Sequence, residues 1–229
     1  MSLKYDLSAG TTRGLNQKLH SLGIANNTES INVINPNGAH ALAVGLSSPL
    51  KINIQGHVGY YCAGMNQMAE VTVDGNAGPA VAENMMSGYI TVTGNVSHYA
   101  GATAHGGTLL VCGDASSRCG ISLKGADIIV KGSVGHMSAF MAQSGRMVVC
   151  GDAGEALGDS LYETRLYVRG SVASLGADCV QKSMAEKHKN ELEALLICAG
   201  ITGADAAEFN RFGSARKLYN FKVDNADAY

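Results

Sequence analysis

The segment KINIQGHVG at residues 51–59 is followed by EVTVDGNAG at 70–78 and YITVTGNVS at 89–97, each 19 positions after the last. Glycine makes up only 29 of the 229 residues, so composition does not explain this spacing. A fixed period near 20 residues indicates one structural unit stacked on copies of itself. The register continues along the chain and places glycine at seven equally spaced positions: Gly56, Gly75, Gly94, Gly113, Gly132, Gly151 and Gly170.

Apolar residues recur at fixed offsets from each of these glycines. The positions four and two before the glycine are apolar in every unit. A spacing of two predicts a strand that turns one face inward. The strict alternation of valine and alanine two positions after the glycine predicts that large and small side chains interleave along a close-packed core. That column reads Val58, Ala77, Val96, Ala115, Val134, Ala153 and Val172.

Small residues fill three further columns, which begin at Gly59, Ala63 and Ala69 and predict corners of the chain. Strand, corner, short strand and corner in every unit predict an all-β fold, a single-stranded right-handed parallel β-helix of about seven 19-residue coils. The period-defining glycines are expected to lie inside the rod or at bends with positive φ. Substitution of Gly113 should therefore be costly, whereas Asn95, which faces outward, should tolerate change.

The first 50 residues are interpreted as a cap, because a solenoid needs its terminal coils covered. Residues 33–51 read as a degraded first coil, in which Val33 takes the place of Ile52. A short helix is expected at 11–20.

Residues 51–178 form the parallel β-helix itself, and residues 179–229 are interpreted as a C-terminal helix and tail within one structural domain. The helix is expected at 181–199, where apolar residues follow helical spacing with charged residues between them. The stretch 205–229 reads as an extended arm that needs a surface to lie on.

Composition and charge narrow the function classes. The net charge of −2 and the pI of about 6.4 give no reason to expect nucleic acid or an anionic membrane as a partner. No apolar run approaches the ~20 residues of a membrane helix, and the first residues lack an apolar signal core. The six cysteines include no CxxC pair, which favours reduced thiols and a cytoplasmic location.

The polar residues that could carry chemistry do not form a recognisable site. His98 and His136 fall in one column two coils apart, at roughly 10 Å, which is too far for direct sharing of a metal ion. Cys112 and Cys150 are spaced in the same way and are expected to remain separate surface side chains. We therefore predict no catalytic, cofactor-binding or metal-binding residue in this chain. The other candidates lie on one coil or in turns: His105, Asp114, Asp152 and Asp159.

The position three before each glycine predicts a covered surface in the C-terminal half of the rod. It is polar in the early coils and apolar from the fourth coil onward. An apolar strip on an outer face is normally covered, here either by the chain's own helix at 181–199 or by a partner subunit. We call the strip the ridge; it consists of Leu110, Ile129, Val148 and Tyr167.

The glycine-repeat coils at 33–178 resemble the C-terminal β-helix domain of the glutamate synthase large subunit, which is named for its GxGxG repeats. The same domain occurs as the β-helix subunit of formylmethanofuran dehydrogenase. The tail RFGSARKLYNF at 211–221, with VDN at 223–225, resembles the free-standing β-helix subunits of the N-methylglutamate synthase family, also called methylamine–glutamate N-methyltransferase. The glutaminase domain and the FMN barrel of glutamate synthase have no counterpart in this sequence.

This resemblance implies a non-catalytic scaffold subunit of a complex that converts methylamine and L-glutamate to N-methyl-L-glutamate and ammonia. It implies two partners, a glutaminase-like amidotransferase subunit and an FMN-binding glutamate-synthase-like subunit. The FMN and any iron–sulfur cluster would belong to the second partner, and the isolated chain would be inactive and without cofactor. The alternatives are a β-helix subunit of an ammonia-forming glutamate synthase or of formylmethanofuran dehydrogenase, or a self-sufficient β-helix enzyme or binding protein.

Overall fold

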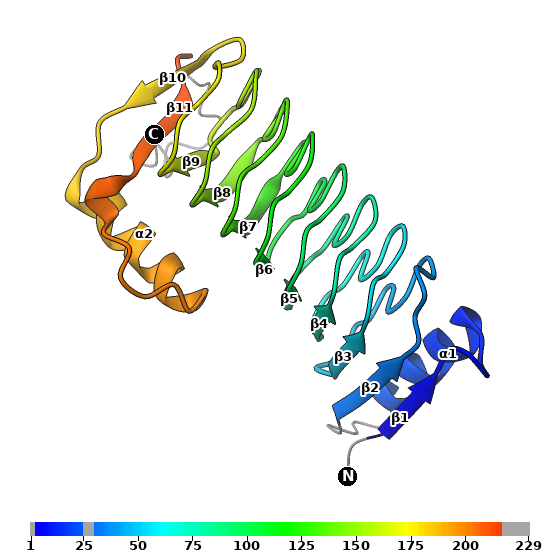
Figure 1. The fold of residues 1–229 in the computed structure, drawn as a ribbon. Helices are drawn as coiled ribbons and strands as arrows, with labels where there is room; N and C mark the ends of the chain where they lie inside the picture. Colours follow the sequence, from blue (N-terminus) through cyan, green and yellow to red (C-terminus); the bar gives the residue numbers. More distant parts are fainter. Residues whose placement is uncertain (1–2, 25–29, 217–229) are drawn as a thin grey trace.

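The computed structural model describes residues 3–24 and 30–216, which form a rod of stacked coils (Figure 1). Its strands make one eleven-stranded sheet in the order β1-β2-β3-β4-β5-β6-β7-β8-β9-β11-β10. In chain order the elements are β1 (Leu3–Asp6), α1 (Thr12–Ile24), β2 (Ser30–Ile34), β3 (Lys51–Gln55), β4 (Glu70–Asp74), β5 (Tyr89–Val92), β6 (Thr108–Val111), β7 (Lys124–Val130), β8 (Ser144–Val149), β9 (Arg165–Val168), β10 (Cys179–Lys182), α2 (Glu186–Cys198), η1 (Ala206–Glu208) and β11 (Asn210–Ser214).

Each coil contributes one strand to the sheet. Outside the strand, the valine or alanine two positions after the glycine forms a parallel bridge with the equivalent residue of the next coil. The strands from β3 to β9 pair in parallel at the predicted register, with Ile52 opposite Val71 and Val73 opposite Val92. The valine–alanine column forms a continuous series of parallel bridges that runs from Val58 to its last member in the seventh coil. Both apolar columns of the strands are buried, which confirms the predicted parallel β-helix of about seven turns.

The corners combine left-handed backbone with burial, which explains the columns of small residues. Ala63, Ala82 and Ala139 are fully buried and have φ values of 54°, 58° and 58°. Gly120 occupies the same column with φ of 67°, and a Cβ there would come within 2.5 Å of the Met147 side chain. A larger side chain would therefore have to be both strained and overpacked.

The period-defining glycines are required mainly by the close approach of neighbouring coils. Only Gly56 among them has a positive φ, of 128°. A Cβ on Gly113 would lie 2.8 Å from the carbonyl oxygen of Gly94 and closer still to the Asn95 side chain. Of the two alternatives expected for this column, positive φ applies to Gly56, whereas the later glycines are required because a Cβ would collide with the neighbouring coil.

The residue after each glycine belongs to a hydrogen-bonded ladder that runs along the rod. The Asp114 N–H donates to Asn95 Oδ1 at 2.8 Å, and the Ser133 N–H donates to Asp114 Oδ1 at 2.7 Å. Asn95 is exposed, as predicted, but its side chain accepts a hydrogen bond, so we expect a substitution there to cost some stability. This polar ladder consists of His57, Asn76, Asn95, Asp114, Ser133, Asp152 and Ser171.

The N-terminal end of the core is covered by α1, where the helix predicted at 11–20 forms. Leu15 and Leu19 are fully buried against the first coils. The Asn16 side chain donates to the carbonyl of Ala41 and accepts from the N–H of Ala43, at 2.8 and 2.9 Å. These two bonds satisfy backbone groups that have no preceding coil to pair with.

The first coil is longer than the period that follows it. In the pairing of β2 with β3, Ile31 lies opposite Ile52 and Val33 lies opposite Ile54, an offset of 21 positions. The alignment of Val33 with Ile52 is therefore wrong by two residues. Two additional residues in the loop before β3 account for the difference.

At the C-terminal end, the predicted helix at 181–199 is shortened to α2, because residues 179–182 form β10 instead. β11 lies between β9 and β10 and pairs antiparallel with both. Its Phe212 joins the main core, where it closes the end of the rod. The predicted arm at 205–229 thus begins as η1 and β11, and its residues 217–229 lie outside the described part of the chain.

Candidate functional surface and basic cavity

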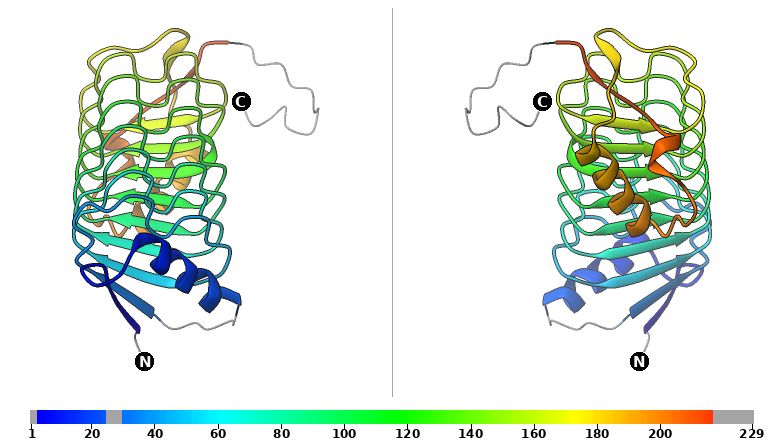
Figure 2. Two further views of the ribbon diagram at one scale, coloured as in Figure 1. Left: turned by 90° about the vertical axis from the view of Figure 1, so that its right-hand side faces the viewer. Right: turned by 90° about the vertical axis from the view of Figure 1, so that its left-hand side faces the viewer.

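The ridge is covered by the chain's own C-terminal segment. Ile129, Val148 and Tyr167 are fully buried, and Leu110 is 6% exposed. Figure 2 shows α2 lying across the C-terminal half of the sheet in its right-hand view. The partner-subunit alternative for this strip is therefore wrong. The covering side chains are Leu192, Leu195, Leu196, Ala199, Ala206 and Phe209.

Charged side chains hold α2 in place beside this apolar contact. Arg165 donates two hydrogen bonds to the Glu191 carboxylate, both at 2.9 Å, and the Tyr167 hydroxyl donates a third at 2.5 Å. Arg146 lies 3.5 Å from the same carboxylate and makes two bonds of 2.6 Å to Asp127. Bidentate arginine–carboxylate pairs of this kind fix orientation as well as position.

The environment of Glu191 keeps its carboxylate ionised. Burial by itself would raise the pKa, but the hydrogen bond from Tyr167 and the charges of Arg165 and Arg146 outweigh it, so the pKa lies below its ordinary value. Burial and the adjacent Glu191 carboxylate raise the pKa of the Tyr167 hydroxyl, which therefore stays protonated as a donor. The docking of α2 is consequently electrostatic as well as hydrophobic.

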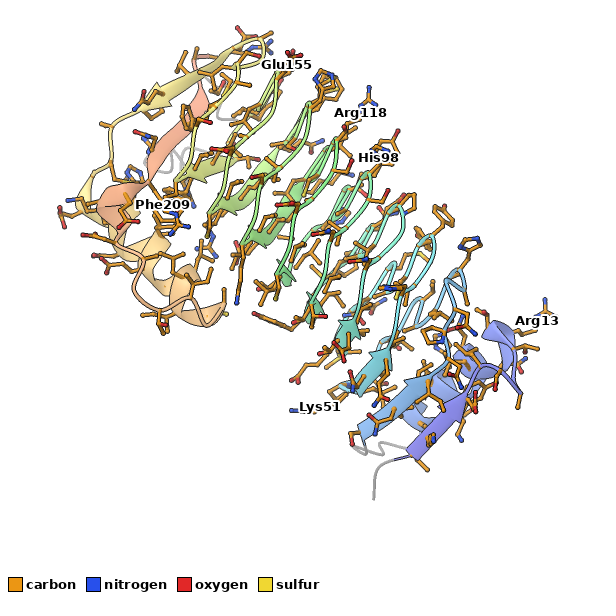
Figure 3. All side chains as sticks on the ribbon, in the orientation of Figure 1. Arg13, Lys51, His98, Arg118, Glu155 and Phe209 are labelled. Atoms are coloured by element: carbon orange, nitrogen blue, oxygen red, sulfur yellow. The ribbon has the colours of Figure 1, made fainter. Side chains whose placement is uncertain are left out.

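The histidines considered as site residues lie apart from this region. Figure 3 shows His98 on the side of the rod opposite Phe209. Its Nδ1 lies 3.2 Å from Ser116 Oγ, and it is exposed, as are His105 and His136. Within residues 3–24 and 30–216, no three side chains of His, Cys, Asp or Glu are grouped so that they could hold a metal ion.

The three aspartates considered as site residues connect neighbouring coils. Asp114 and Asp152 belong to the polar ladder, and the Ser171 N–H bond contributes most to lowering the pKa of Asp152. Asp159 accepts from the N–H of Ala177 at 3.2 Å. Each carboxylate thus satisfies a backbone donor, and the structure does not bring these three together.

All six cysteines are free thiols. Cys150 is only 6% exposed and packs in the cluster under α2, so the expectation that it is a surface residue is wrong. Cys112 is half-buried, and Cys198 at the end of α2 is exposed. Burial raises the pKa of three thiols to about 12: Cys62, Cys119 and Cys179.

A cavity of about 210 Å³ lies where β9, β10, β11 and α2 meet. Its lining comes from residues 162–165, from four residues of and after β11, and from Lys182 and His188; the four are Arg211, Gly213, Ser214 and Arg216. We call it the basic cavity, because its wall holds four cationic side chains and one carboxylate: Arg165, Lys182, Arg211, Arg216 and Glu163.

A comparison with known proteins shows a relative that aligns with nearly the full length of the chain. No family model matches the sequence. It is 57% identical over 224 residues to "Protein GlxC" of Rhizobium meliloti (strain 1021), and the aligned region covers 98% of each chain. The chain belongs to the GlxC family. Because the match spans nearly the full length, it takes in both end caps of this GlxC-family chain as well as the coils.

Sequence reasoning missed the basic cavity of this GlxC-family protein. Its residues come from separate segments that meet only because β11 inserts between β9 and β10. One signal was available for the neighbouring ion pairs, since Asp127, Arg146 and Arg165 recur at the 19-residue period on one face. Among the described residues, no helix is both long enough and apolar enough to span a bilayer.

Proposed function

We propose that this GlxC-family chain is a non-catalytic assembly subunit of a glutamate-synthase-like complex, of the N-methylglutamate synthase type. The observation that carries the proposal is the run of glycine-repeat coils, which resembles the β-helix domain of glutamate synthase. The complex would form N-methyl-L-glutamate and ammonia from methylamine and L-glutamate. FMN and any iron–sulfur cluster would reside on the FMN-binding partner, and a glutaminase-like amidotransferase would be the other partner.

The acidic side chains considered as site residues form hydrogen bonds within the fold, which supports a scaffold role. Asp114, Asp152 and Asp159 accept backbone hydrogen bonds across neighbouring coils, and Glu191 anchors α2. A general acid or base must be within reach of a substrate proton. These carboxylates are instead engaged in holding the rod together.

An assembly subunit must also offer a surface to its partners, and one apolar cluster suits this role. Met65, Met68 and Met86 are 44%, 51% and 46% exposed, and they lie on adjacent coils joined by a 2.7 Å bond from the Met86 N–H to the Asn66 carbonyl. Methionine is a flexible, polarisable side chain suited to protein contacts, and exposed apolar clusters mark such contacts. We expect a partner subunit of the complex to contact this face.

The experiment is co-expression of the chain with an amidotransferase-like and an FMN-binding synthase-like subunit. We expect a stable complex that forms N-methylglutamate from methylamine and L-glutamate, detected by mass spectrometry. The isolated chain should show no flavin absorbance and no product. Flavin bound to the isolated chain, or full activity of the partners without it, would contradict the proposal.

A matched pair of variants tests the contact face in the same assay. Met86→Gln should weaken recovery of the complex while leaving the thermal midpoint of the isolated chain unchanged. His105→Gln changes the equivalent exposed position one coil further along and should leave both quantities unchanged. Equal recovery of the two variants would remove the methionine cluster from the interface.

A further inference from the structure

We propose that the basic cavity binds a small carboxylate or phosphate anion through Arg211, Lys182 and His188. The inference concerns a site on this chain alone and holds whether or not the proposed complex forms.

The cavity wall holds more positive charge than its own carboxylates neutralise. Arg165 is paired with Glu191, and Arg216 is paired with Asp178. Arg211 donates from Nε to the Ser183 carbonyl at 2.9 Å. Its terminal nitrogens have no hydrogen bond within the described residues, and the Lys182 ammonium has no ion pair there.

The environment of Arg211 disfavours its positive charge. Burial contributes most to lowering the pKa of Arg211, and the neighbouring Arg165 charge adds to this, while Tyr167 and Glu191 oppose it. Arg211 is half-buried, and two like charges in the same wall repel each other. An anion in the cavity would relieve that repulsion, and the planar guanidinium fork suits the two oxygens of a carboxylate or phosphate.

Two neutral groups in the lining add hydrogen-bonding capacity. The Ala185 N–H donates to His188 Nδ1 at 3.2 Å, so the neutral ring carries its proton on Nε2, which can donate. Burial and the Arg211 charge lower the pKa of His188, which favours this neutral form. Thr164 is 1% exposed, and its hydroxyl has no hydrogen-bond partner in the described part of the chain; buried polar atoms are normally satisfied.

The volume limits the ligand to a small molecule. At about 210 Å³ the cavity is smaller than the ~300 Å³ at which pockets for drug-sized ligands begin. A free mono- or dicarboxylate, or inorganic phosphate, matches both this size and the donor set.

The test is isothermal titration calorimetry on the full chain with sodium succinate, sodium phosphate, and sodium chloride at matched ionic strength. We expect saturable binding of succinate, phosphate or both, with chloride giving none. The relative affinities of the first two would identify the carboxylate or the phosphate as the preferred group. Absence of saturable binding by both would overturn the proposal.

Matched variants assign the binding to the cavity. Arg211→Gln should weaken affinity by at least about tenfold, because a hydrogen-bonded charge is lost. Lys124→Gln removes one positive charge from an exposed strand end and should leave affinity unchanged. Equal affinities in these two variants would refute the site. If Arg211→Gln fails to fold, Lys182→Gln takes its place, and the anion should raise the pKa of His188 measured by NMR in the unaltered chain.

Discussion

Gly113 offers the sharpest test of how the coils stack. In Gly113→Ala, the added Cβ would lie 2.8 Å from the Gly94 carbonyl oxygen and nearer still to Asn95 Oδ1. Overpacking of this kind costs about 1–3 kcal/mol. Displacement of Asn95 would also weaken its bond to the Asp114 N–H, which is worth about 1 kcal/mol. The expected loss is therefore about 2–4 kcal/mol in the free energy of unfolding, or about 4–16 °C in the thermal midpoint for a chain of this size.

The matched control for this substitution is Gly213→Ala. A Cβ on Gly213 would meet only the Lys182 side chain, at 3.6 Å, which is an ordinary contact. Its φ is outside the left-handed region, so the change should be neutral or slightly stabilising. Both variants are to be compared by urea denaturation and by thermal unfolding monitored by circular dichroism.

A double-mutant cycle separates the two collisions at Gly113. Asn95→Ala alone should cost about 1 kcal/mol or less. The double variant with Gly113→Ala should lose less stability than the two single losses combined, because the nearest colliding atom is gone while the Gly94 carbonyl remains. Strict additivity, or equal stabilities of Gly113→Ala and Gly213→Ala, would refute this explanation of the glycine column.

Three further outcomes follow from the contacts of α2 and the cysteines. Ile129→Asp should lower the stability of the isolated chain by several kcal/mol, because an unpaired charge would be buried under α2. Thr72→Asp, in the same column but in the half of the rod that α2 does not cover, should cost little, and equal midpoints of the two variants in thermal unfolding would contradict the covering of the ridge by α2. The pKa of Glu191 is lowered from 4.5, so its contribution to stability is fully present above about pH 4.5 and should be lost as the pH falls through the folded-state pKa. Urea denaturation at pH 7 and pH 3.5 should show this loss, and Glu191→Gln should reduce the difference between the two; an unchanged difference would count against the network. Ellman's reagent at pH 8 should react rapidly with Cys198 in the native chain, and Cys198→Ser should remove the fast phase; a fast phase that persists would mean another thiol is accessible.

The sequence was sufficient for the coils because their side-chain columns are local and periodic. Ile52 and Val71 pair at the distance of one period, and the alternation of Val58 with Ala77 becomes a line of bridges. The ridge could be predicted for the same reason, since Ile129 is apolar where Thr72 is polar. Periodicity even indicated a cover, because an isolated rod would expose that strip to water.

The remaining features depend on contacts that no period encodes. The first coil departs from the 19-residue spacing, so Val33 could not be placed by counting. Residues 179–182 form β10 only because β11, about 30 residues later, supplies a partner. Glu191 is one of several charged residues in the helical segment, and its role depends on how α2 lies on the sheet. The basic cavity depends on the same insertion of β11 between β9 and β10, so it could not be predicted from the periodic pattern either.

The polar ladder has a consequence for how such a chain can change length. Each rung takes its acceptor from one coil and its N–H donor from the next, so every internal coil meets its neighbours through the same two half-bonds. Duplication of a 38-residue, two-coil segment between Gly56 and Gly170 would recreate both halves and keep the alternation of valine and alanine, whereas insertion of one residue between a strand and its ladder residue would break the bonds. The distance between the two capped ends is therefore adjustable in steps of two coils, or about 10 Å. Such a chain can act as a spacer whose length is altered by pairs of coils without redesign of either end.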